Sequence, residues 1–370
     1  MADLRLDDIE QMLRDTARRF LRQVSVERLL SWETSEDGYD SDVWSSMVGL
    51  GWASLTQAAE GGGGANLIHT GIVLGETGRA GLPSPLFQTL VTVLGLTRLG
   101  GDPAALLAER LAQGEARAVT VAPADPGRLV TLTENPDGTA VLCGSPVLTE
   151  WALWAQTFIV PARVEGAPER CALVVVDAQA GGVGVEEATS FDNERIGVVT
   201  FDRVVVPASG VLSADVRADD LETMLALRDL LRCSEMLGGA RRALELSVQY
   251  ATDRVQFGQP LGTKQAVQHR CADMLIALDG AWLATFEALW TASTGPASTR
   301  SIAVARFQAA RACEQAVLGA AQLTGAMGFT REYPLNVFFR RVKAQQLRLG
   351  SVTSQLDSLA AEFLAVSEGV

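Results

Sequence analysis

Hydrophobic residues recur at helical spacing through the first third of the chain. Apolar positions three and four residues apart predict one helix over residues 6–30 and another over residues 42–50. The same pattern covers residues 66–79, and it continues over residues 82–113 with interruptions at prolines and glycines. The glycine run at 61–64 has no clear strand before it and no Lys-Ser or Lys-Thr after it. We therefore interpret it as a connector between helices rather than a phosphate loop.

Short β-branched runs replace the helical pattern near residue 118. They are separated by turn signals such as Asn135-Pro136-Asp137-Gly138, and this texture extends to about residue 212. The runs that we expect to form strands are residues 130–133, 139–142, 158–160, 173–176 and 198–201. Residues 214–222 are charged and are predicted to form a linker, after which the chain is rich in alanine and leucine and is again helical.

This order of elements predicts an α+β fold in three parts. We expect a helical domain over residues 1–117, a β domain over residues 118–213 and a second helical domain over residues 214–370. Helices, then strands, then helices indicate segregated domains, whereas strict alternation would have indicated a parallel βαβ sheet.

The composition supports a large core and restricts the partners. Of the 370 residues, 48% are hydrophobic and 20% are charged, which excludes disordered and collagen-like proteins. Acidic residues outnumber basic ones by 44 to 31, and the net charge is -13 with both histidines neutral. A field of that sign repels nucleic acids and anionic membranes, so we expect neither as a partner. An anionic ligand would need a local cluster of arginines or helix N-termini.

The cysteines and the apolar runs point to a soluble, cytoplasmic protein without a metal site. No Cys-x-x-Cys pair is present, so we expect small buried hydrophobic side chains rather than disulfides or metal ligands. No apolar run of about 20 residues occurs, and acidic residues stand where a secretory signal would be basic. The cysteines are Cys143, Cys171, Cys233, Cys271 and Cys313.

Two segments of the last third carry candidate chemistry. The first is Arg254-Val255-Gln256-Phe257-Gly258, where a guanidinium at a helix end can hold a pyrophosphate through two parallel hydrogen bonds. The second is Gln322-Leu323-Thr324-Gly325-Ala326-Met327-Gly328, whose small residues would let the backbone approach an anion and present N–H groups to it. Taken singly, each has a plainer interpretation, as a surface charge or as a helix cap.

Together, in this order and about 70 residues apart, the two segments resemble motifs of the acyl-CoA dehydrogenase family. The family reads Arg-x-x-Phe-Gly, then a Gln, and later Gln-x-x-Gly-Gly-x-Gly followed by Glu-Tyr-Pro; here Ala326 replaces the middle glycine. Residues 201–207 are similar to a family strand, and residues 50–64 and 75–78 to its N-terminal turn and helix. The resemblance covers nearly the whole chain. It implies a central β-barrel or β-sandwich domain between an N-terminal helical domain and a C-terminal four-helix bundle.

The resemblance also implies FAD as the cofactor. In the family these motifs serve the FAD that is bound mainly by the neighbouring subunit. By this correspondence Arg254 would bind the pyrophosphate, Phe257 would pack near the adenine side, and Gln265 would form a hydrogen bond there. The other edge of the dinucleotide would be lined by Gln322, Gly325, Ala326 and Gly328.

The catalytic base of the family is missing from this chain. In the family a carboxylate removes the α-proton of an acyl thioester while the flavin N5 accepts the β-hydride, and it usually lies just before a Gly-Thr. Leu349 stands at that position, and leucine cannot accept a proton. An alternative family position corresponds to Arg228, and Asp229 beside it would point about 100° away on the helix. We therefore assign no catalytic residue.

The β domain departs from the family as well. The family flanks the flavin ring with Thr-Glu-Pro-x-Ala-Gly-Ser-Asp and Trp-Ile-Thr, whereas the corresponding residues here, 121–126 and 147–150, lack the stacking tryptophan. Trp151 and Trp154 lie close by and could compensate after a register shift. Aromatic residues in strands more often pack in the core.

These selective losses lead to one main hypothesis. The chain is expected to be a subunit of a heteromeric, FAD-dependent acyl-CoA dehydrogenase of α2β2 type, and to complete the FAD site of a homologous catalytic subunit. The resemblance is to actinobacterial dehydrogenases that act on steroid side-chain thioesters in lipid metabolism. It implies an acyl-CoA substrate and an electron-transfer flavoprotein as acceptor.

Two alternatives stay open at this point. The chain could be a homomeric dehydrogenase of acyl-CoA or of an acyl group on a carrier protein, with Asp229 as an unusual base. It could also be a non-catalytic interaction protein that keeps the fold for oligomerisation.

Overall fold

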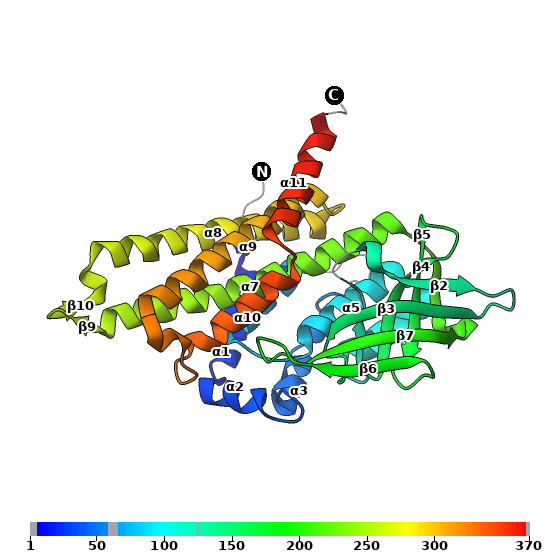
Figure 1. The fold of residues 1–370 in the computed structure, drawn as a ribbon, viewed down its shortest axis with the longest axis horizontal. Coiled ribbons are helices and arrows are strands. Elements are labelled where there is room, and N and C mark those ends of the chain that lie inside the picture. Colours follow the sequence, from blue (N-terminus) through cyan, green and yellow to red (C-terminus); the bar gives the residue numbers. More distant parts are fainter. Residues whose placement is uncertain (1–5, 58–65, 124–125, 368–370) are drawn as a thin grey trace. The chain divides into compact units, whose positions relative to one another are not determined.

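The computed structural model describes residues 6–57, 66–123 and 126–367 (Figure 1). Contacts within the chain group these residues into two compact units. The first unit comprises Met1–Ser31, Leu67–Leu82 and Asp229–Val370, and the second comprises Trp32–Asn66 and Pro83–Arg228. The first unit therefore joins N-terminal helices to the C-terminal ones, so the contacts do not follow the three-part order along the chain.

The first helix of the chain begins at a capping box. Helix α1 (Asp8–Leu21) has Asp7 as its N-cap: the Asp7 carboxylate accepts from the Glu10 N–H at 2.7 Å, and the Glu10 carboxylate accepts from the Asp7 N–H at 2.9 Å. The single helix predicted over residues 6–30 was wrong, because α1 ends and α2 (Val26–Glu33) starts anew. The Ser25 hydroxyl accepts from the Arg28 N–H and so favours a new helix start.

Long helices form the rest of the first unit. Helices α8 (Gln265–Thr294) and α9 (Thr299–Thr324) pack on each other and on the second half of α7 (Ala218–Asp253) around a core of buried alanine, leucine, methionine and cysteine side chains. The remaining elements are α4 (Leu67–Ala80), the hairpin β9 (Val255–Gln256) and β10 (Gln259–Pro260), the short helices η4 (Leu261–Thr263) and η5 (Gly325–Phe329), α10 (Leu335–Arg348) and α11 (Val352–Ser367).

Helices α4 and α7 cross without side chains between them. A methyl group at Gly238 would overlap the carbonyl oxygen of Gly75, and one at Gly78 would overlap the carbonyl oxygen of Glu235. Both glycines are therefore required by the close approach of two backbones.

The second unit is built on one eight-stranded mixed sheet in the order β6-β7-β3-β2-β4-β5-β8, with β1 paired to β4. Strands β1 and β2 run parallel to β4, and the other pairs are antiparallel. The strands are β1 (Ala118–Thr120), β2 (Val130–Glu134), β3 (Ala140–Glu150), β4 (Thr157–Val164), β5 (Arg170–Asp177), β6 (Val183–Ala188), β7 (Ile196–Val206) and β8 (Val211–Arg217).

Helices and short turns complete the second unit. Helix α5 packs on β1, and α6 packs on α5 and β8. The bounds of these elements are α3 (Ser41–Gly49), η1 (Trp52–Ser54), α5 (Leu86–Leu99), α6 (Gly101–Ala112), η2 (Pro126–Arg128) and η3 (Ala208–Gly210).

The predicted strands are confirmed, but the predicted linker is absent and two of the five cysteines are not buried. Residues 214–222 are not a linker, because β8 continues to Arg217 and α7 begins at Ala218. The glycine run at 61–64 lies outside the described residues. Three cysteines are buried as expected, but Cys143 is exposed and Cys271 is half-buried. Among the described helices, none has the length and apolar character needed to cross a membrane.

We expect Gly238→Ala to destabilise the protein, because the added methyl group forces two helix backbones apart. Overpacking of this kind costs about 1–3 kcal/mol in free energy of unfolding. Gly280→Ala is the matched control: it lies in the interior of α8 with open space at its Cβ position, so it should stabilise by up to about 1 kcal/mol through helix propensity. Thermal unfolding of the two variants should shift in opposite directions, and a loss of stability in both would contradict the explanation.

Candidate functional site

A β-hairpin projects from the end of α7 in the first unit. Arg254 directly follows α7, and its carbonyl accepts from the Leu261 N–H at 2.9 Å, which closes the base of the hairpin. Phe257 and Gly258 form the turn with φ of 57° and 80°. Two consecutive residues in the left-handed region are the signature of a type I′ turn, which matches the twist of the flanking strands.

Phe257 has an unusual conformation for its residue type. A bulky side chain in the left-handed region costs about 1–3 kcal/mol, and glycine or asparagine would adopt this turn more easily. The Phe257 side chain is 93% exposed, so contacts within the chain do not offset that cost. An exposed aromatic residue that keeps a strained backbone is expected to contact a ligand or a partner.

Arg254 is also exposed, and among the described residues its guanidinium has no hydrogen-bond or ion-pair partner. Several other arginines of the first unit are paired with a carboxylate, as at Arg79 and Arg306. The free guanidinium can therefore bind an anion without first releasing a neighbouring acid.

The second candidate segment begins where α9 ends. Gly325 has φ 61° and ψ -144°, and open space surrounds the position that its Cβ would take. The need for glycine at this position is therefore conformational. Gly328 is different, because a methyl group there would overlap the hydroxyl of Thr324. Its glycine is explained by packing inside the chain, and Gly328 is the one buried residue of the turn, whose other residues are exposed.

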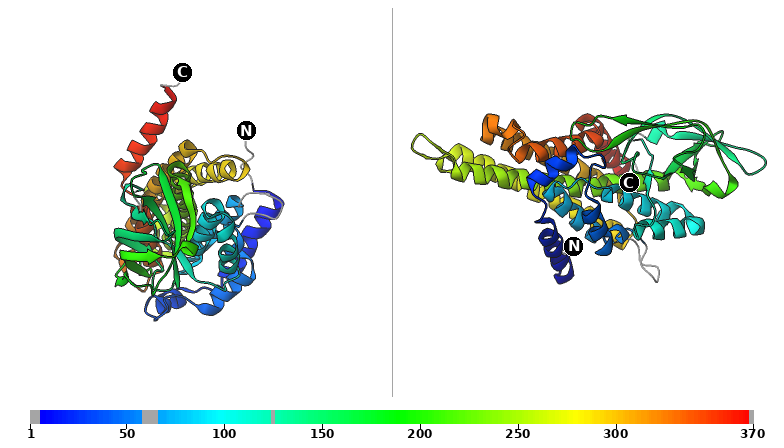
Figure 2. Two further views of the ribbon diagram at one scale, coloured as in Figure 1. Left: turned by 90° about the vertical axis from the view of Figure 1, so that its right-hand side faces the viewer. Right: turned by 90° about the horizontal axis from the view of Figure 1, so that it is seen from below.

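The structure brings the two segments to the same end of the first unit, as Figures 1 and 2 show. Tyr250, on the last turns of α7, packs edge-on against Tyr333 with ring centroids 5.9 Å apart. The Tyr333 hydroxyl also donates to the carbonyl of Leu246 at 3.2 Å. Gln265 opens α8 and Gln322 lies in the last turn of α9, both exposed. The tyrosine pair was missed in the sequence, although Tyr333 belongs to the quoted Glu-Tyr-Pro.

Apolar side chains are unusually exposed at this end. They come from the hairpin and from η5, and they are Val255, Phe257, Met327 and Phe329. Exposed apolar residues that cluster in this way usually mark a surface that binds a partner or a ligand. The end of the unit thus combines a free guanidinium, exposed amides and apolar rings.

The position of the family base is part of a packed network. Leu349 is 2% exposed and belongs to the hydrophobic core of the first unit. Its carbonyl accepts from Nη2 of Arg306 at 3.1 Å and from the Gln355 amide at 3.3 Å. The same Arg306 nitrogen lies 3.2 Å from Oδ2 of Asp229, so the one carboxylate considered as a substitute base is buried and paired with a guanidinium.

The cysteine next to this network is chemically inert. Burial raises the pKa of the Cys233 thiol to about 12, with smaller opposing effects from the nearby charges of Arg306 and Asp229. Burial also raises the pKa of Cys313. Neither thiol can act as a nucleophile or a base near neutral pH.

In the second unit, the strand that would contact a flavin ring in the family has different chemistry. The segment lacks the family's tryptophan: Val147 is buried, Leu148 is exposed, and Thr149 is buried with its hydroxyl donating to the Val147 carbonyl. The Glu150 carboxylate accepts from the Gln88 amide at 2.5 Å. This segment therefore offers neither an aromatic face nor a free hydroxyl.

The neighbouring tryptophans do not compensate. Trp151 is 2% exposed and packs edge-on against Tyr39, with ring centroids 5.6 Å apart. Trp154 packs edge-on against Trp44 and donates to the Tyr39 hydroxyl at 3.2 Å. Both act as core residues of the second unit. Residues 124–125 of the other ring-contacting segment lie outside the described residues.

Family models match two long stretches of this chain. Residues 7–103 match "Acyl-CoA dehydrogenase, N-terminal domain", and residues 221–364 match "Acyl-CoA dehydrogenase, C-terminal domain". The chain belongs to the acyl-CoA dehydrogenase family. Its fold is that of the family, with an N-terminal helical domain, a central sheet domain and a C-terminal helical domain.

Relatives of known name are similar over nearly the full length. Acyl-CoA dehydrogenase IpdE2 of Mycolicibacterium smegmatis is 26% identical over 368 residues, which are 96% of this chain and 99% of that protein. The IpdE2 of Mycobacterium tuberculosis is 29% identical over 359 residues, 95% and 96% of the two chains.

Two solved structures share the fold of this chain. The Tcur3481-Tcur3483 steroid ACAD is 26% identical, with a TM-score of 0.88 over 98% of this chain and 99% of that chain. The ChsE4-ChsE5 complex from Mycobacterium tuberculosis is 23% identical, with the same TM-score and coverage, and is evidence for the fold alone. Similar proteins thus include chains solved as heteromeric complexes.

FAD is the cofactor of this family. The end of the first unit that carries the hairpin and η5 fits part of such a dinucleotide. The free guanidinium of Arg254 suits a pyrophosphate, and the Phe257 ring suits an aromatic or apolar partner. The ring-contacting strand of the second unit does not fit, since Glu150 adds a negative charge and the stacking side chain is absent. Among the described residues no group of three or more acidic, histidine or cysteine side chains is placed to hold a metal ion.

We expect Asp229→Asn to lower stability without changing turnover of the assembled enzyme. The substitution leaves Arg306 without its carboxylate in a mostly buried position, which costs about 1–3 kcal/mol. Glu287→Gln, an exposed acid on α8, is the control and should change neither property. Loss of turnover in Asp229→Asn with unchanged thermal stability would instead identify Asp229 as a base.

Proposed function

We propose that this chain is the non-catalytic subunit of a heteromeric acyl-CoA dehydrogenase, in which it completes the FAD site of a homologous subunit that carries the base. One contrast carries the proposal. The groups that would serve a partner's cofactor are exposed and free, whereas the groups at the chain's own base and ring positions are packed and paired. A homomer would need both sets in every copy.

The residues of this chain would act by binding and positioning. Arg254 would hold the pyrophosphate through parallel hydrogen bonds, and Phe257 would cover the adenine side and exclude water. Gln265 and Gln322 present exposed amides at the helix ends, and Gly325 and Ala326 would line the other edge of the dinucleotide, whereas the buried Gly328 would only shape the turn. The bound flavin would accept a hydride from the β-carbon of the acyl thioester, and the base would come from the partner subunit.

The names of similar proteins support the class of substrate and assembly. A steroid ACAD and the IpdE2 dehydrogenases are among them, so we propose an acyl-CoA substrate of steroid or related lipid metabolism. An α2β2 assembly, an electron-transfer flavoprotein as acceptor and a cytoplasmic location complete the proposal. Fold similarity alone does not define a substrate, so these parts rest on analogy.

The role of Arg254 can be tested in the complex isolated through an affinity tag on this chain. We expect Arg254→Gln to weaken FAD binding by about ten- to a hundredfold, because a charge-assisted hydrogen bond to the pyrophosphate is lost. Arg331→Gln removes another exposed arginine from the same end of the unit and should leave FAD bound. Flavin absorbance per complex after dilution measures both, and equal flavin loss in the two variants would contradict a specific role for Arg254.

Phe257→Gly separates the fold of the hairpin from its function. Glycine adopts the left-handed region without strain, so the variant should be at least as stable as the parent chain. Flavin retention or subunit association should nevertheless fall, because the aromatic ring is gone. A variant that is more stable and still binds flavin normally would show that the ring has no binding role.

A further inference from the structure

A cavity of about 200 Å³ lies in the first unit between α1, α4, α7 and α8. A second cavity of about 300 Å³ adjoins it and shares Arg18, Glu76 and Arg79 in its wall. Both lie along the middle of α7. Asp253, the last residue of α7 before the hairpin, is 15 residues from Gly238 in the cavity wall. Fifteen residues of helix span about 22 Å. The cavities are therefore distinct from the hairpin site.

The floor of the first cavity is apolar. It is formed by Ile72 of α4, Leu237 of α7, and Leu278 and Trp282 of α8. Gly75 and Gly238 contribute backbone, since α4 and α7 meet there without side chains. The absence of side chains at this crossing leaves the space open beside the indole of Trp282.

The walls are rich in arginine. Six arginines line the two cavities, from α1 and its C-cap, α4 and α7: Arg14, Arg18, Arg22, Arg79, Arg241 and Arg242. Four carboxylates bond to them, on Asp15, Glu76, Glu245 and Asp279. A surplus of two positive charges remains in a chain whose net charge is -13. The cavities are thus a local positive site in an acidic protein.

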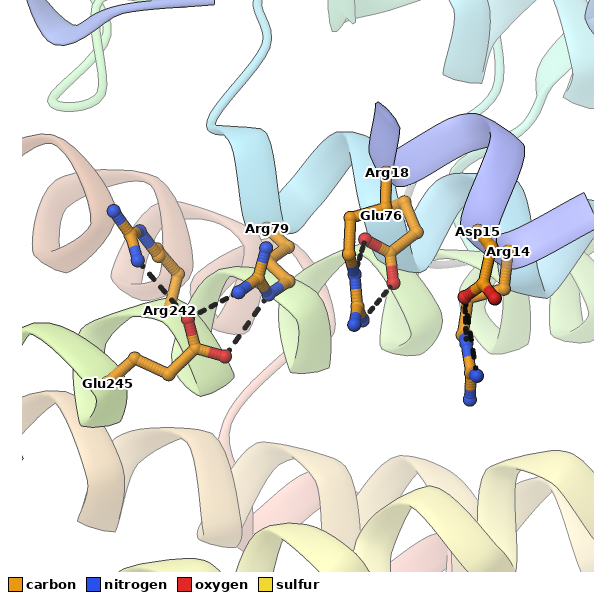
Figure 3. Close-up of polar contacts among 7 residues, drawn as sticks. All are labelled: Arg14, Asp15, Arg18, Glu76, Arg79, Arg242 and Glu245. Atoms are coloured by element: carbon orange, nitrogen blue, oxygen red, sulfur yellow. Dashed lines mark hydrogen bonds and ion pairs between the residues drawn. The ribbon is translucent and has the colours of Figure 1, made fainter. Parts of the chain in front are cut away.

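The carboxylates orient the guanidinium groups and leave donors free. Glu76 accepts from Nε and Nη2 of Arg18 at 3.0 and 2.6 Å, and Glu245 accepts from Nε and Nη2 of Arg79 at 3.1 and 2.6 Å (Figure 3). A guanidinium has five N–H donors, so three remain on each arginine. Glu245 also pairs with Arg242, so two cations share one acid. Donors held in place in this way lose little freedom when they bind an anion.

We propose that the first cavity binds a small organic anion, a carboxylate with an apolar body. The arginine donors at the wall would hold the carboxylate, and the floor beside Trp282 would hold the apolar part. The volume is below the range of roughly 300–1,000 Å³ that accommodates drug-sized ligands, so the occupant is small. This site is independent of FAD binding and of the proposed function.

Hexanoate is a suitable probe for the purified full chain, with hexan-1-ol and inorganic phosphate as comparisons. Hexanoate has both a negative charge and an apolar body. Hexan-1-ol has only the apolar body, and phosphate has only the charge. Isothermal titration should show the tightest binding for hexanoate. Phosphate or hexan-1-ol binding as tightly as hexanoate would overturn the proposed ligand class, and no hexanoate binding at millimolar concentration would overturn the site.

Arg241→Gln tests the wall directly. Arg241 is half-exposed and pairs with the exposed Asp279, so its removal should leave the fold intact. We expect hexanoate binding to weaken about tenfold or more, because a charge-assisted hydrogen bond is lost. Arg19→Gln removes an exposed arginine of α1 that lines neither cavity and should leave binding unchanged. Unchanged binding in Arg241→Gln, or equal weakening in both variants, would overturn the assignment.

Discussion

The direct crossing of α4 on α7 is the constraint on which the first unit depends. At Gly78 and Gly238 the two helices touch backbone to backbone, and a side chain at either position would overlap a carbonyl oxygen of the other helix. This contact joins a segment near residue 75 to the C-terminal helices. It also sets Glu76 and Arg79, which flank the glycines on α4, against arginines and acids of α1 and α7. The helix bundle and the arginine-lined cavities are thus consequences of one close approach.

Helix α7 carries both the lost and the retained features of the family. In its first third, Asp229 is paired with Arg306, which also binds the carbonyl of Leu349 at the position of the family base. At its end, Arg254 and Phe257 are exposed, and Phe257 is held in a conformation that costs free energy. Strain without an internal contact to offset it is expected to persist only where an external contact uses it. The exposed Phe257 ring and the Arg254 guanidinium are therefore available to a partner's cofactor.

Much of the fold was predictable from the sequence. The type and order of elements followed from periodicity, and the motifs identified the family, because Arg-x-x-Phe-Gly and the later glycine turn are local in sequence. The break between α1 and α2 and the continuation of β8 to Arg217 were missed. These boundaries depend on a weak cap at Ser25 and on pairing with β5. Neither leaves a strong local signal.

The site was less predictable, because its decisive contacts join distant residues. Arg18 and Glu76 are 58 positions apart, and Arg79 and Glu245 are 166 positions apart. The burial of Trp151 and the pairing of Asp229 likewise required the three-dimensional structure. Charge counting alone predicted an acidic protein with isolated anion sites. It did not show that six arginines of α1 and its C-cap, α4 and α7 would gather around two cavities.

The most direct test of the central claim is the number of FAD molecules bound, measured by native mass spectrometry of the chain alone and of the complex that it forms in its source. We predict no flavin in the isolated chain and one FAD for each heterodimer of this chain with a homologous, base-carrying subunit. An isolated chain that retains stoichiometric FAD and oxidises an acyl-CoA would contradict the account.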